Sequence, residues 1–284
     1  MDLKELPTER AACNLCGAVT SKTIGLNSGL HMVRCVSCGL VYVNPRPTLS
    51  GLHTYYAQSD LMEQQSWGSY YQHTASQLHG LWSERFRDLQ RWRTGPGTRL
   101  LDVGSGYGDF LHIAAQAGWA TTGFEFSPVV ARVAREKYGI DVRVGELETL
   151  SLPPQSFDVA SLWHVLEHMP DPMAALCRVR GLLKEDGILV VEVPNLNFIV
   201  RRSYKFPLNA ALHLYHFSGD SLSRVVRKAG FEVLECRQGN TGMLYRSALK
   251  RLAKKCIYAA GSAAQSVLKI NVSDSIRLYA RCRY

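Results

Sequence analysis

From Thr98 onward, apolar and polar positions follow two different spacings that alternate along the chain. Short apolar runs are separated by segments in which apolar residues recur every three or four positions. Apolar runs bounded by turn residues are typical of buried strands, and the three-to-four spacing is typical of amphipathic helices. Strands that alternate with helices predict an α/β fold with a doubly wound, mostly parallel sheet covered on both faces. The expected strands lie at 100–103, 120–126, near 142, at 157–163 and at 187–193.

The first hundred residues divide differently. GLVYVNPRP reads as a short strand ended by prolines, and helical spacing is present from about Tyr70 to Arg91. The GPG at 95–97 marks a boundary. We therefore expect a small module at 1–50, a helical connector at 51–97 and a main domain at 98–284.

Composition indicates a folded globular protein. Of the 284 residues, 46% are hydrophobic and 20% are charged, which excludes the disordered and fibrous classes. The start MDLKELPTER lacks the apolar segment of a signal peptide, and no run of about 18 apolar residues occurs. We expect a cytoplasmic protein with reduced cysteines.

The net charge of +9 is concentrated at one end of the sequence, since nine basic residues and one acidic residue lie in 241–284. Within this stretch, 246–269 has the spacing of a basic amphipathic helix. Such a helix suits peripheral contact with the inner face of a membrane or with nucleic acid phosphates. It is equally typical of a helix that packs on the sheet or on a second subunit, and these alternatives stay open.

Two cysteine pairs form the clearest metal-binding pattern. Each pair is C-x2-C followed by glycine, and the pairs are 18 residues apart. Four thiolates around a d¹⁰ cation make a closed tetrahedral Zn²⁺ site with no open position, so the zinc would be structural. Free or redox-active thiols are the alternative, but a redox C-x-x-C usually comes as one pair. The expected ligands are Cys13, Cys16, Cys35 and Cys38.

A glycine-rich turn follows the first strand of the main domain. It reads DVGSGYG, with Asp102 ahead of Gly104 and Gly106, and Glu125 ends the next strand. A nicotinamide dinucleotide fingerprint would need a third glycine where this chain has Asp109. Carboxylates on both sides of the loop would repel a pyrophosphate and suit an ammonium group, and Glu125 could accept from a ribose diol. The turn therefore favours S-adenosylmethionine.

The chain here resembles the class I S-adenosylmethionine-dependent methyltransferases. The pieces that carry the resemblance are LLDVGSGYGDF, TTGFEFSP, VRVGELETLSLPPQSFDVASLWHVLEHMPDP, LLKEDGILVVEVPN and HLYHFSGDSL followed by KAGFEV. Together they span about Thr98 to Phe231, with a final strand near the C-terminus. The chain is similar to the branch with a four-cysteine zinc knuckle before this domain, common in bacterial sugar, lipid and natural-product pathways. The resemblance implies a seven-stranded sheet.

The resemblance also implies roles for individual residues. Asp102 would hold the methionine amino group, with Gly104 and Gly106 packed beneath it, and Glu125 would bind the ribose hydroxyls. The remaining expected contacts are Glu146 at the adenine amino group, the Leu147 amide at the ring, and Trp163 with His164 on the sulfonium side. Glu148 is an alternative to Glu146, and Trp163 is equally expected in the core.

Methyl transfer mainly needs alignment, and a hydroxyl or acidic carbon acceptor also needs a base of near-neutral pKa. His164 and His168 follow one strand, and His213 and His216 lie in a long insertion at 195–217, where acceptor sites are built. We expect His213 to be the base, with His216 and His164 as further catalytic candidates. Their alternative role is to anchor loops. Family members commonly have Pro-Arg before His213, where this chain has Ala-Leu.

These features predict methyl transfer to an O, N or C atom of a small-molecule, sugar or lipid-linked intermediate. The first alternative is an RNA base methyltransferase, because a zinc knuckle and a basic face could grip RNA. Against it, only Lys22, Arg34 and Arg46 are basic between Ala11 and Pro47. A second alternative is an adaptor that binds no cofactor, which the intact glycine loop disfavours.

Overall fold

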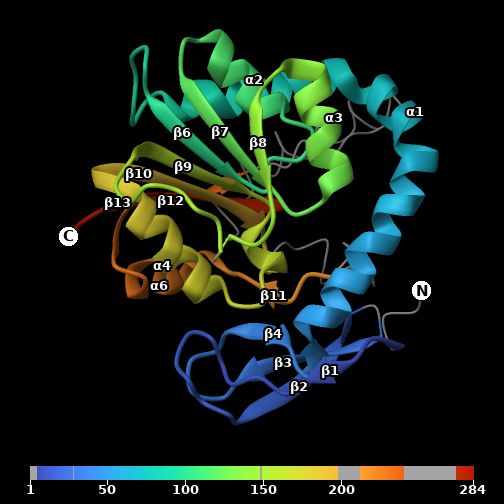
Figure 1. Ribbon diagram of the computed structural model, residues 1–284. Coiled ribbons are helices and arrows are strands. Elements are labelled where there is room, and N and C mark those ends of the chain that lie inside the picture. Colours follow the sequence, from blue (N-terminus) through green and yellow to red (C-terminus); the bar gives the residue numbers. More distant parts are fainter. Residues whose placement is uncertain (1–4, 28, 148, 198–211, 240–272) are drawn as a thin grey trace.

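A seven-stranded sheet organises the main domain in a computed structural model of the protein (Figure 1). The structure describes residues 5–27, 29–147, 149–197, 212–239 and 273–284. The strand order is β12-β13-β10-β9-β6-β7-β8, and β13 alone is antiparallel to its neighbours β10 and β12. The doubly wound, mostly parallel sheet expected from the sequence is therefore confirmed. The strands are β6 (Arg99–Val103), β7 (Ala120–Glu125), β8 (Asp141–Val144), β9 (Phe157–Trp163), β10 (Leu183–Pro194), β12 (Phe231–Gly239) and β13 (Ser275–Cys282).

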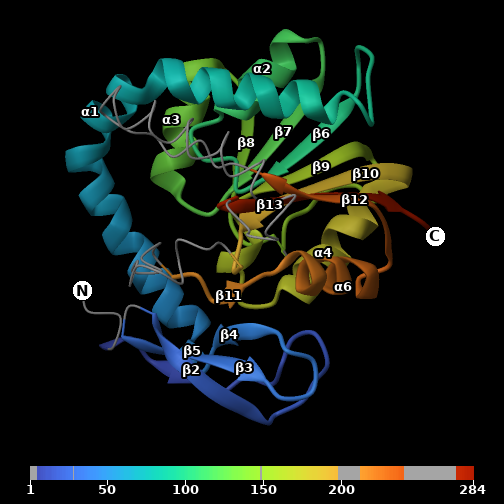
Figure 2. The same ribbon diagram turned by 180° about the vertical axis from the view of Figure 1, so that it is seen from behind.

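Helices cover both faces of this sheet. On one face lie α2 (Asp109–Gln116), α3 (Pro128–Tyr138) and the end of α1 (Leu49–Leu89); on the other lie α4 (Pro172–Leu182) and α6 (Gly219–Lys228) (Figures 1 and 2). Side chains at the helix starts explain these bounds. Ser127, Asp171 and Ser218 each accept a hydrogen bond from a first-turn backbone N–H, which satisfies a donor that has no partner within the helix.

The order of the strands fixes where a ligand can bind. The chain passes from β6 outward through β7 and β8, then returns to β9 on the other side of β6. Ligands of open α/β sheets bind outside the carboxyl ends of the strands at such a reversal. The turn after β6 and the short helix η2 (Leu166–His168), which follows β9, lie at this point.

The N-terminal module completes its own sheet with a strand from the main domain. Its order is β11-β4-β3-β2, with β2 (Ser21–Asn27), β3 (Leu30–Cys35) and β4 (Val41–Val43). The fourth strand, β11 (Tyr215–His216), comes from the end of the expected insertion. A two-stranded ribbon of β1 (Thr8–Glu9) and β5 (Arg46–Pro47) lies beside it. The module and the methyl-transfer domain expected at 98–284 are thus joined by backbone pairing.

Helix α1 is the connector expected at 51–97, and it is longer than the spacing predicted. It has 41 residues and begins at a Thr48 cap. In both views it runs from the small sheet along one side of the molecule and then crosses the face that carries α2 (Figures 1 and 2). Its last turns enter the core, where Phe86 and Leu89 are buried with α2 and β6.

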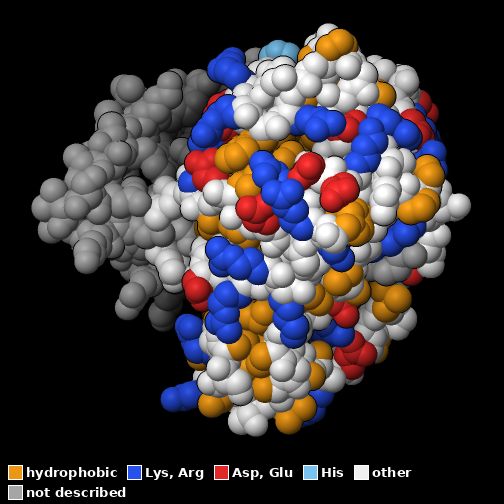
Figure 3. Space-filling model, turned by 90° about the vertical axis from the view of Figure 1, so that its left-hand side faces the viewer, with side chains coloured by type: hydrophobic (Ala, Val, Ile, Leu, Met, Phe, Trp, Pro, Cys, Tyr) orange, Lys and Arg blue, Asp and Glu red, His pale blue; other side chains and the backbone are white. Residues whose placement is uncertain are grey.

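Two expectations fall largely outside the described residues. These are the basic amphipathic helix at 246–269 and most of the insertion at 195–217. In the part of the chain that the structure describes, no helix has the length and apolar character needed to cross a membrane. Figure 3 shows one face of the molecule, where Lys and Arg side chains are distributed among Asp, Glu and hydrophobic side chains.

Candidate functional site

The glycine-rich turn after β6 is tied to the neighbouring strand. The amides of Gly104 and Ser105 both donate to the carbonyl of Phe124 on β7, at 2.7 and 2.9 Å. A Cβ on Gly104 would lie 2.3 Å from Val165 Cγ2, so this position must remain glycine. A Cβ on Gly106 would meet nothing within 4 Å. The turn therefore packs against Val165 at Gly104, whereas Gly106 faces open space.

Asp102 places a buried carboxyl group directly below this turn. The residue is 2% exposed, and Oδ1 accepts a hydrogen bond from Ser161 Oγ at 2.6 Å. Burial, helped by the nearby Glu125 charge, raises the pKa of Asp102 to about 7, although the hydrogen bond from Ser161 opposes the shift. Among the described residues, no cationic side chain forms an ion pair with Asp102. A buried carboxyl of this kind is suited to an ammonium ligand.

Glu125, at the end of β7, faces the same turn. Its Oε2 accepts from the Gly106 amide at 2.8 Å, and its Oε1 accepts from the Ser127 amide at 3.0 Å. Each carboxylate oxygen has a second lone pair, so the group can still accept from a diol. The two amide bonds fix its orientation over the open side of Gly106.

Glu146 and Leu147 lie further along the same edge, after β8. Glu146 Oε1 is 3.1 Å from His53 Nε2 of α1, and Leu147 is 2% exposed. The rings of His53 and Tyr56 pack against Phe126 at 5.1 Å each. The first turns of α1 therefore cover the side of the edge where the sequence places adenine, a contact that the sequence did not predict.

Trp163 ends β9 and packs inward. It is 6% exposed, lies in the hydrophobic cluster with Phe110, and stacks edge-on with Trp82 at 6.1 Å. The guanidinium groups of Arg85 and Arg277 lie 5.3 and 5.6 Å from its ring centre. Its core role is therefore plain, and its expected contact with the cofactor stays a prediction.

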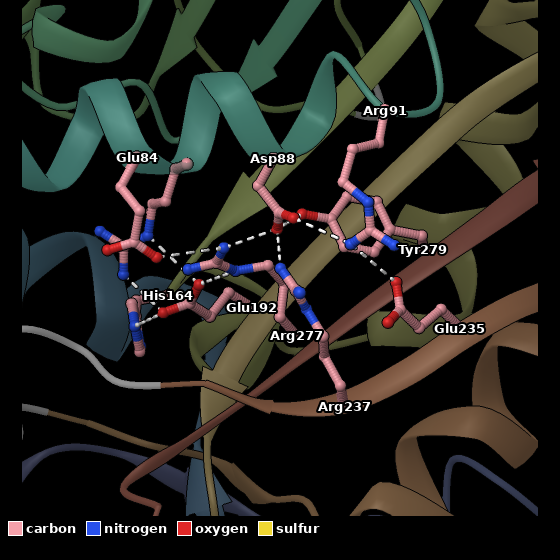
Figure 4. A network of polar contacts seen from close by, with 10 residues as sticks. Glu84, Asp88, Arg91, His164, Glu192, Glu235, Arg237, Arg277 and Tyr279 are labelled. Atoms are coloured by element: carbon pink, nitrogen blue, oxygen red, sulfur yellow. Dashed lines mark hydrogen bonds and ion pairs between the residues drawn. The ribbon is translucent and has the colours of Figure 1, made fainter. Parts of the chain in front are cut away.

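A buried ion network links α1 to three strands beside this tryptophan (Figure 4). Glu192 of β10 is fully buried, and both Arg85 of α1 and Arg277 of β13 bind its carboxylate. Arg277 also reaches Asp88 at 2.8 Å. Although burial alone would raise it, these cations and His164 hold the pKa of Glu192 well below its usual range. The network anchors the connector helix to the site.

His164 lies at the edge of this network. Its Nε2 is 3.3 Å from Glu192 Oε1, and its Nδ1 is 3.5 Å from Glu167 Oε1 (Figure 4 shows the contact with Glu192). Carboxylates only accept, so this arrangement favours a proton on both nitrogens. Burial opposes the charged form, but the two carboxylates raise the pKa of His164 to about 9. His164 is thus arranged as a proton donor.

The remaining histidines gather around Glu167. His213 Nε2 is 3.8 Å from Glu167 Oε1, and the ring of His213 is 4.7 Å from that of His168 and 6.2 Å from that of His216. His213 and His216 are 5% and 3% exposed. The structure therefore brings His213 and His168 together with a buried carboxylate, and places His216 on the strand that pairs with the N-terminal module.

The four N-terminal cysteines also converge. Their sulfur atoms lie within 4.8 Å of one another, and Cys13 to Cys38 and Cys16 to Cys35 are 3.4 and 3.5 Å apart. These separations are far beyond a disulfide bond of about 2.05 Å and suit sulfurs about 2.3 Å from one central ion. Gly17, with φ +78°, closes one of the two knuckles. The donor set fits a structural zinc ion.

Comparison with known proteins assigns the chain to a family. Residues 71–236, more than half of the chain, match the family described as "Methyltransferase domain". The chain belongs to this methyltransferase family. Two curated proteins named ubiquinone biosynthesis O-methyltransferase are similar to it. That of Xanthomonas campestris is 36% identical over 106 residues, which are 35% of this chain and 44% of the relative. That of Coxiella burnetii is 27% identical over 144 residues, which are 49% of this chain and 60% of the relative.

This methyltransferase chain spans about half the length of the curated relatives it matches. Among solved structures, a SAM dependent methyltransferase from Archaeoglobus fulgidus has a TM-score of 0.54 at 18% identity, covering 72% of this chain and 94% of that chain. This likeness shows the fold. The cofactor of the fold family is S-adenosylmethionine, and the buried Asp102 carboxyl, the open space above Gly106 and the oriented Glu125 fit it.

Three residues of the methyltransferase site were missed by the sequence reasoning. Glu167 was read only as part of a helix turn, Glu192 as part of an apolar strand, and Arg85 as part of the connector. A signal was available for Glu192, since a charged residue inside GILVVEV must be paired if the strand is buried. Helical spacing gave no such signal for Arg85, because its partner is 107 residues away.

Proposed function

We propose that this methyltransferase transfers the methyl group of S-adenosylmethionine to an oxygen of a small-molecule acceptor. The observation that carries the proposal is a glycine turn preceded by the buried Asp102 carboxyl and bonded through the Gly106 amide to the carboxylate of Glu125. The names of the curated relatives support oxygen over nitrogen or carbon. A sugar or lipid-linked acceptor remains within this class.

The chain's own residues would hold the cofactor as follows. Asp102 would pair with the ammonium group, and Glu125 would accept from the ribose hydroxyls. Glu146 and the Leu147 amide would meet the adenine, and Trp163 would support the strand end beneath the sulfonium. When bound, S-adenosylmethionine supplies a methyl group on a positively charged sulfur.

The acceptor would lie against the histidines at the carboxyl ends of β9 and β10. His164, with a carboxylate near each nitrogen, would orient Glu167 toward the acceptor. Removal of the hydroxyl proton is assigned to the cluster around Glu167, which includes His213, the base expected from the sequence. His216 would support this cluster from β11.

An RNA acceptor is less well supported. Of the three basic residues between Ala11 and Pro47, Arg46 is paired with Glu9 at 2.9 Å and contacts Tyr215. Lys22 and Arg34 alone make a sparse surface for phosphates. The cytoplasmic location and the peripheral membrane contact through 246–269 also remain proposals, and they depend on sequence pattern alone.

Transfer of label tests the proposal. The chain is incubated with S-adenosylmethionine carrying a tritiated methyl group and with hydroxylated aromatic, sugar and lipid-linked compounds, or with mixed RNA. We expect label in a hydroxylated small molecule, and at least about tenfold less product with Glu125→Ala. Label in RNA alone, or equal product with Glu125→Ala, would contradict the proposal.

A further inference from the structure

The carboxylate of Glu167 is buried among three imidazoles. The residue is 1% exposed, and His164 Nδ1 lies 3.5 Å from its Oε1, longer than a typical hydrogen bond. A buried carboxylate is costly to desolvate unless a cation or a set of donors compensates it. His164 supplies part of this compensation from one side, and the side that faces His168 and His213 has room for a further cation.

Two imidazoles point their ring nitrogens at this carboxylate. His168 Nε2 is 3.9 Å and His213 Nε2 is 3.8 Å from Glu167 Oε1. One ligand atom from each of the three residues lies within 4.8 Å of the other two. These distances are too long for hydrogen bonds. Around a cation with bonds of about 2.0–2.2 Å, neighbouring ligand atoms would be about 3 to 3.6 Å apart, so a small contraction would complete a site.

The outer contacts of the cluster are those of a metal site. His168 Nδ1 is 3.2 Å from the carbonyl of Leu212, which favours the proton on Nδ1 and a lone pair on Nε2, the nitrogen that faces Glu167. Metal-binding histidines typically donate their other N–H in this way. The Leu214 amide donates to the Glu167 carbonyl at 2.8 Å, and this bond fixes His213 between the two anchors.

The backbone on both sides of the cluster is strained. His164 has φ +58° and Leu212 has φ +50°, although neither is glycine. Strained residues of this kind persist where the surrounding structure requires them, and they gather at functional sites. Here they aim His164 and His213 toward the same carboxylate from two separate segments.

The cluster also lies beside the cofactor turn and has an open side. Val165, two residues before Glu167, packs beneath Gly104. The side chain of His168 is 26% exposed, whereas those of Glu167 and His213 are 1% and 7% exposed. Three protein ligands with one accessible side are typical of catalytic sites, which keep a position for substrate.

We propose that Glu167, His168 and His213 bind a divalent transition-metal ion that holds the acceptor hydroxyl next to the cofactor turn. Two imidazoles and one carboxylate suit Zn²⁺, Fe²⁺, Co²⁺ or Mn²⁺ better than Ca²⁺ or Mg²⁺. The inference rests on the proposed function and gives His213 the role of a ligand in place of a free base. His164 then donates to the outer side of the Glu167 carboxylate.

The chemistry balances without a further reactant. The ion stabilises the ionised acceptor, so the O–H bond breaks and the proton leaves to solvent. An oxygen lone pair forms the new bond to the methyl carbon. The carbon–sulfur bond breaks with its electron pair going to sulfur, so the sulfonium becomes a neutral thioether.

Cobalt titration of the full chain, stripped of metal and then given one equivalent of Zn²⁺ to fill the four-cysteine site, tests the proposed site separately from the cysteines. Co²⁺ bound by imidazole and carboxylate gives weak visible bands, whereas Co²⁺ bound by thiolates gives intense charge-transfer absorption. We expect one Co²⁺ per chain without the thiolate bands, and binding weakened at least about tenfold in Glu167→Gln and His168→Ala. Absence of this binding in the wild-type chain would overturn the proposal.

Matched variants separate loss of the site from loss of the fold. His112→Gln changes a histidine stacked on Tyr138, and Glu232→Gln changes an exposed acid on β12; both should bind Co²⁺ as the wild type does. S-adenosylmethionine binding, measured without added metal, should be unchanged in Glu167→Gln. Equal Co²⁺ binding by Glu167→Gln and the controls would overturn the metal site while leaving cofactor binding untouched.

Discussion

The backbone amide of Gly106 donates to Glu125 Oε2 at 2.8 Å, so the turn after β6 and the acid at the end of β7 hold each other in place. Ser127 contributes the second amide, and Ser127 is also the cap of α3. The same carboxylate therefore orients the glycine turn, the start of a helix and the expected ribose site. A substitution at this position should change ligand binding more than folding.

Glu125→Gln should weaken S-adenosylmethionine binding about 10- to 100-fold. The amide keeps the size of the side chain but removes the charge that strengthens hydrogen bonds from hydroxyl and N–H groups, and each hydrogen bond to a charged group contributes about 1.5–3 kcal/mol. Isothermal titration measures the affinity. Glu136→Gln, an exposed acid on α3, is the control and should bind as the wild type does. A smaller loss in Glu125→Gln than in the control would contradict the role.

Asp102 predicts a pH dependence of cofactor binding. Because burial raises the pKa of the free carboxyl to about 7, the group is largely protonated at pH 6 and ionised at pH 8. An ammonium ligand binds the ionised form, so affinity should rise between pH 6 and pH 8. Titrations across this range check it. Asp102→Asn should bind more weakly and flatten the profile, and a variant with an unchanged slope would show that another group titrates.

The lowered pKa of Asp158 predicts that the stability of the fold depends on pH. Burial opposes ionisation, but the Arg99 amide and the charges of Lys184 and Arg93 lower its pKa overall. A lowered pKa in the folded state gives stability that is present above about pH 4 and lost as the pH falls through the folded-state value. Asp158→Asn should therefore be less stable at pH 7, with the difference shrinking below pH 4. Urea unfolding at both pH values measures it.

The buried pair of Arg85 and Glu192 predicts a large cost when one partner is removed. Arg85→Met leaves the Glu192 charge with less compensation, so unfolding should need about 3 kcal/mol less free energy. The exposed Arg91, which lies just after the end of α1 and pairs with Asp88, gives the control Arg91→Met, where little change is expected. Equal stability of the two variants would mean that the network does not anchor α1.

The folding of the N-terminal module should depend on zinc, and loss of this zinc should also disturb the cluster of Glu167, His168 and His213. Arg224 of α6 donates to the Cys38 carbonyl at 2.9 Å, and β11 pairs with β4. Removing zinc with a chelator, or by Cys35→Ser, should lower the melting temperature and weaken Co²⁺ binding at Glu167 and its histidines. Metal analysis should find one zinc per chain. Cys177→Ser, at an exposed cysteine outside the module, should retain the zinc and the melting temperature.

The sequence allowed prediction of the elements whose cause is local. The glycine turn and the strands on either side of it follow from neighbouring residues, and the structure has them in place. The basic residues near the end were read as a docking surface. Within the described part of that stretch, Arg277 is 2% exposed and pairs with Glu192, so its charge stabilises the core.

Contacts between distant segments could not be predicted from spacing. The pairing of Tyr215 with Tyr42 depends on two short strands that propensity alone does not identify. The contact of His53 with Glu146 depends on how the 41-residue helix α1 packs against the main domain. The position of His213 beside Glu167 depends on how the chain returns from β10 to β11. Each is fixed by tertiary packing, which a single sequence does not report.

The affinity of Gly106→Ala for S-adenosylmethionine tests the central claim most directly. A Cβ here meets no protein atom within 4 Å, so the methyl group enters the space assigned to the cofactor. Gly139→Ala at the end of α3 is the matched control, since Gly139 has φ +64° against φ +54° at Gly106 and is equally open. We predict that Gly106→Ala folds but binds at least about tenfold more weakly than Gly139→Ala. Equal affinities would contradict the placement of the cofactor at this turn.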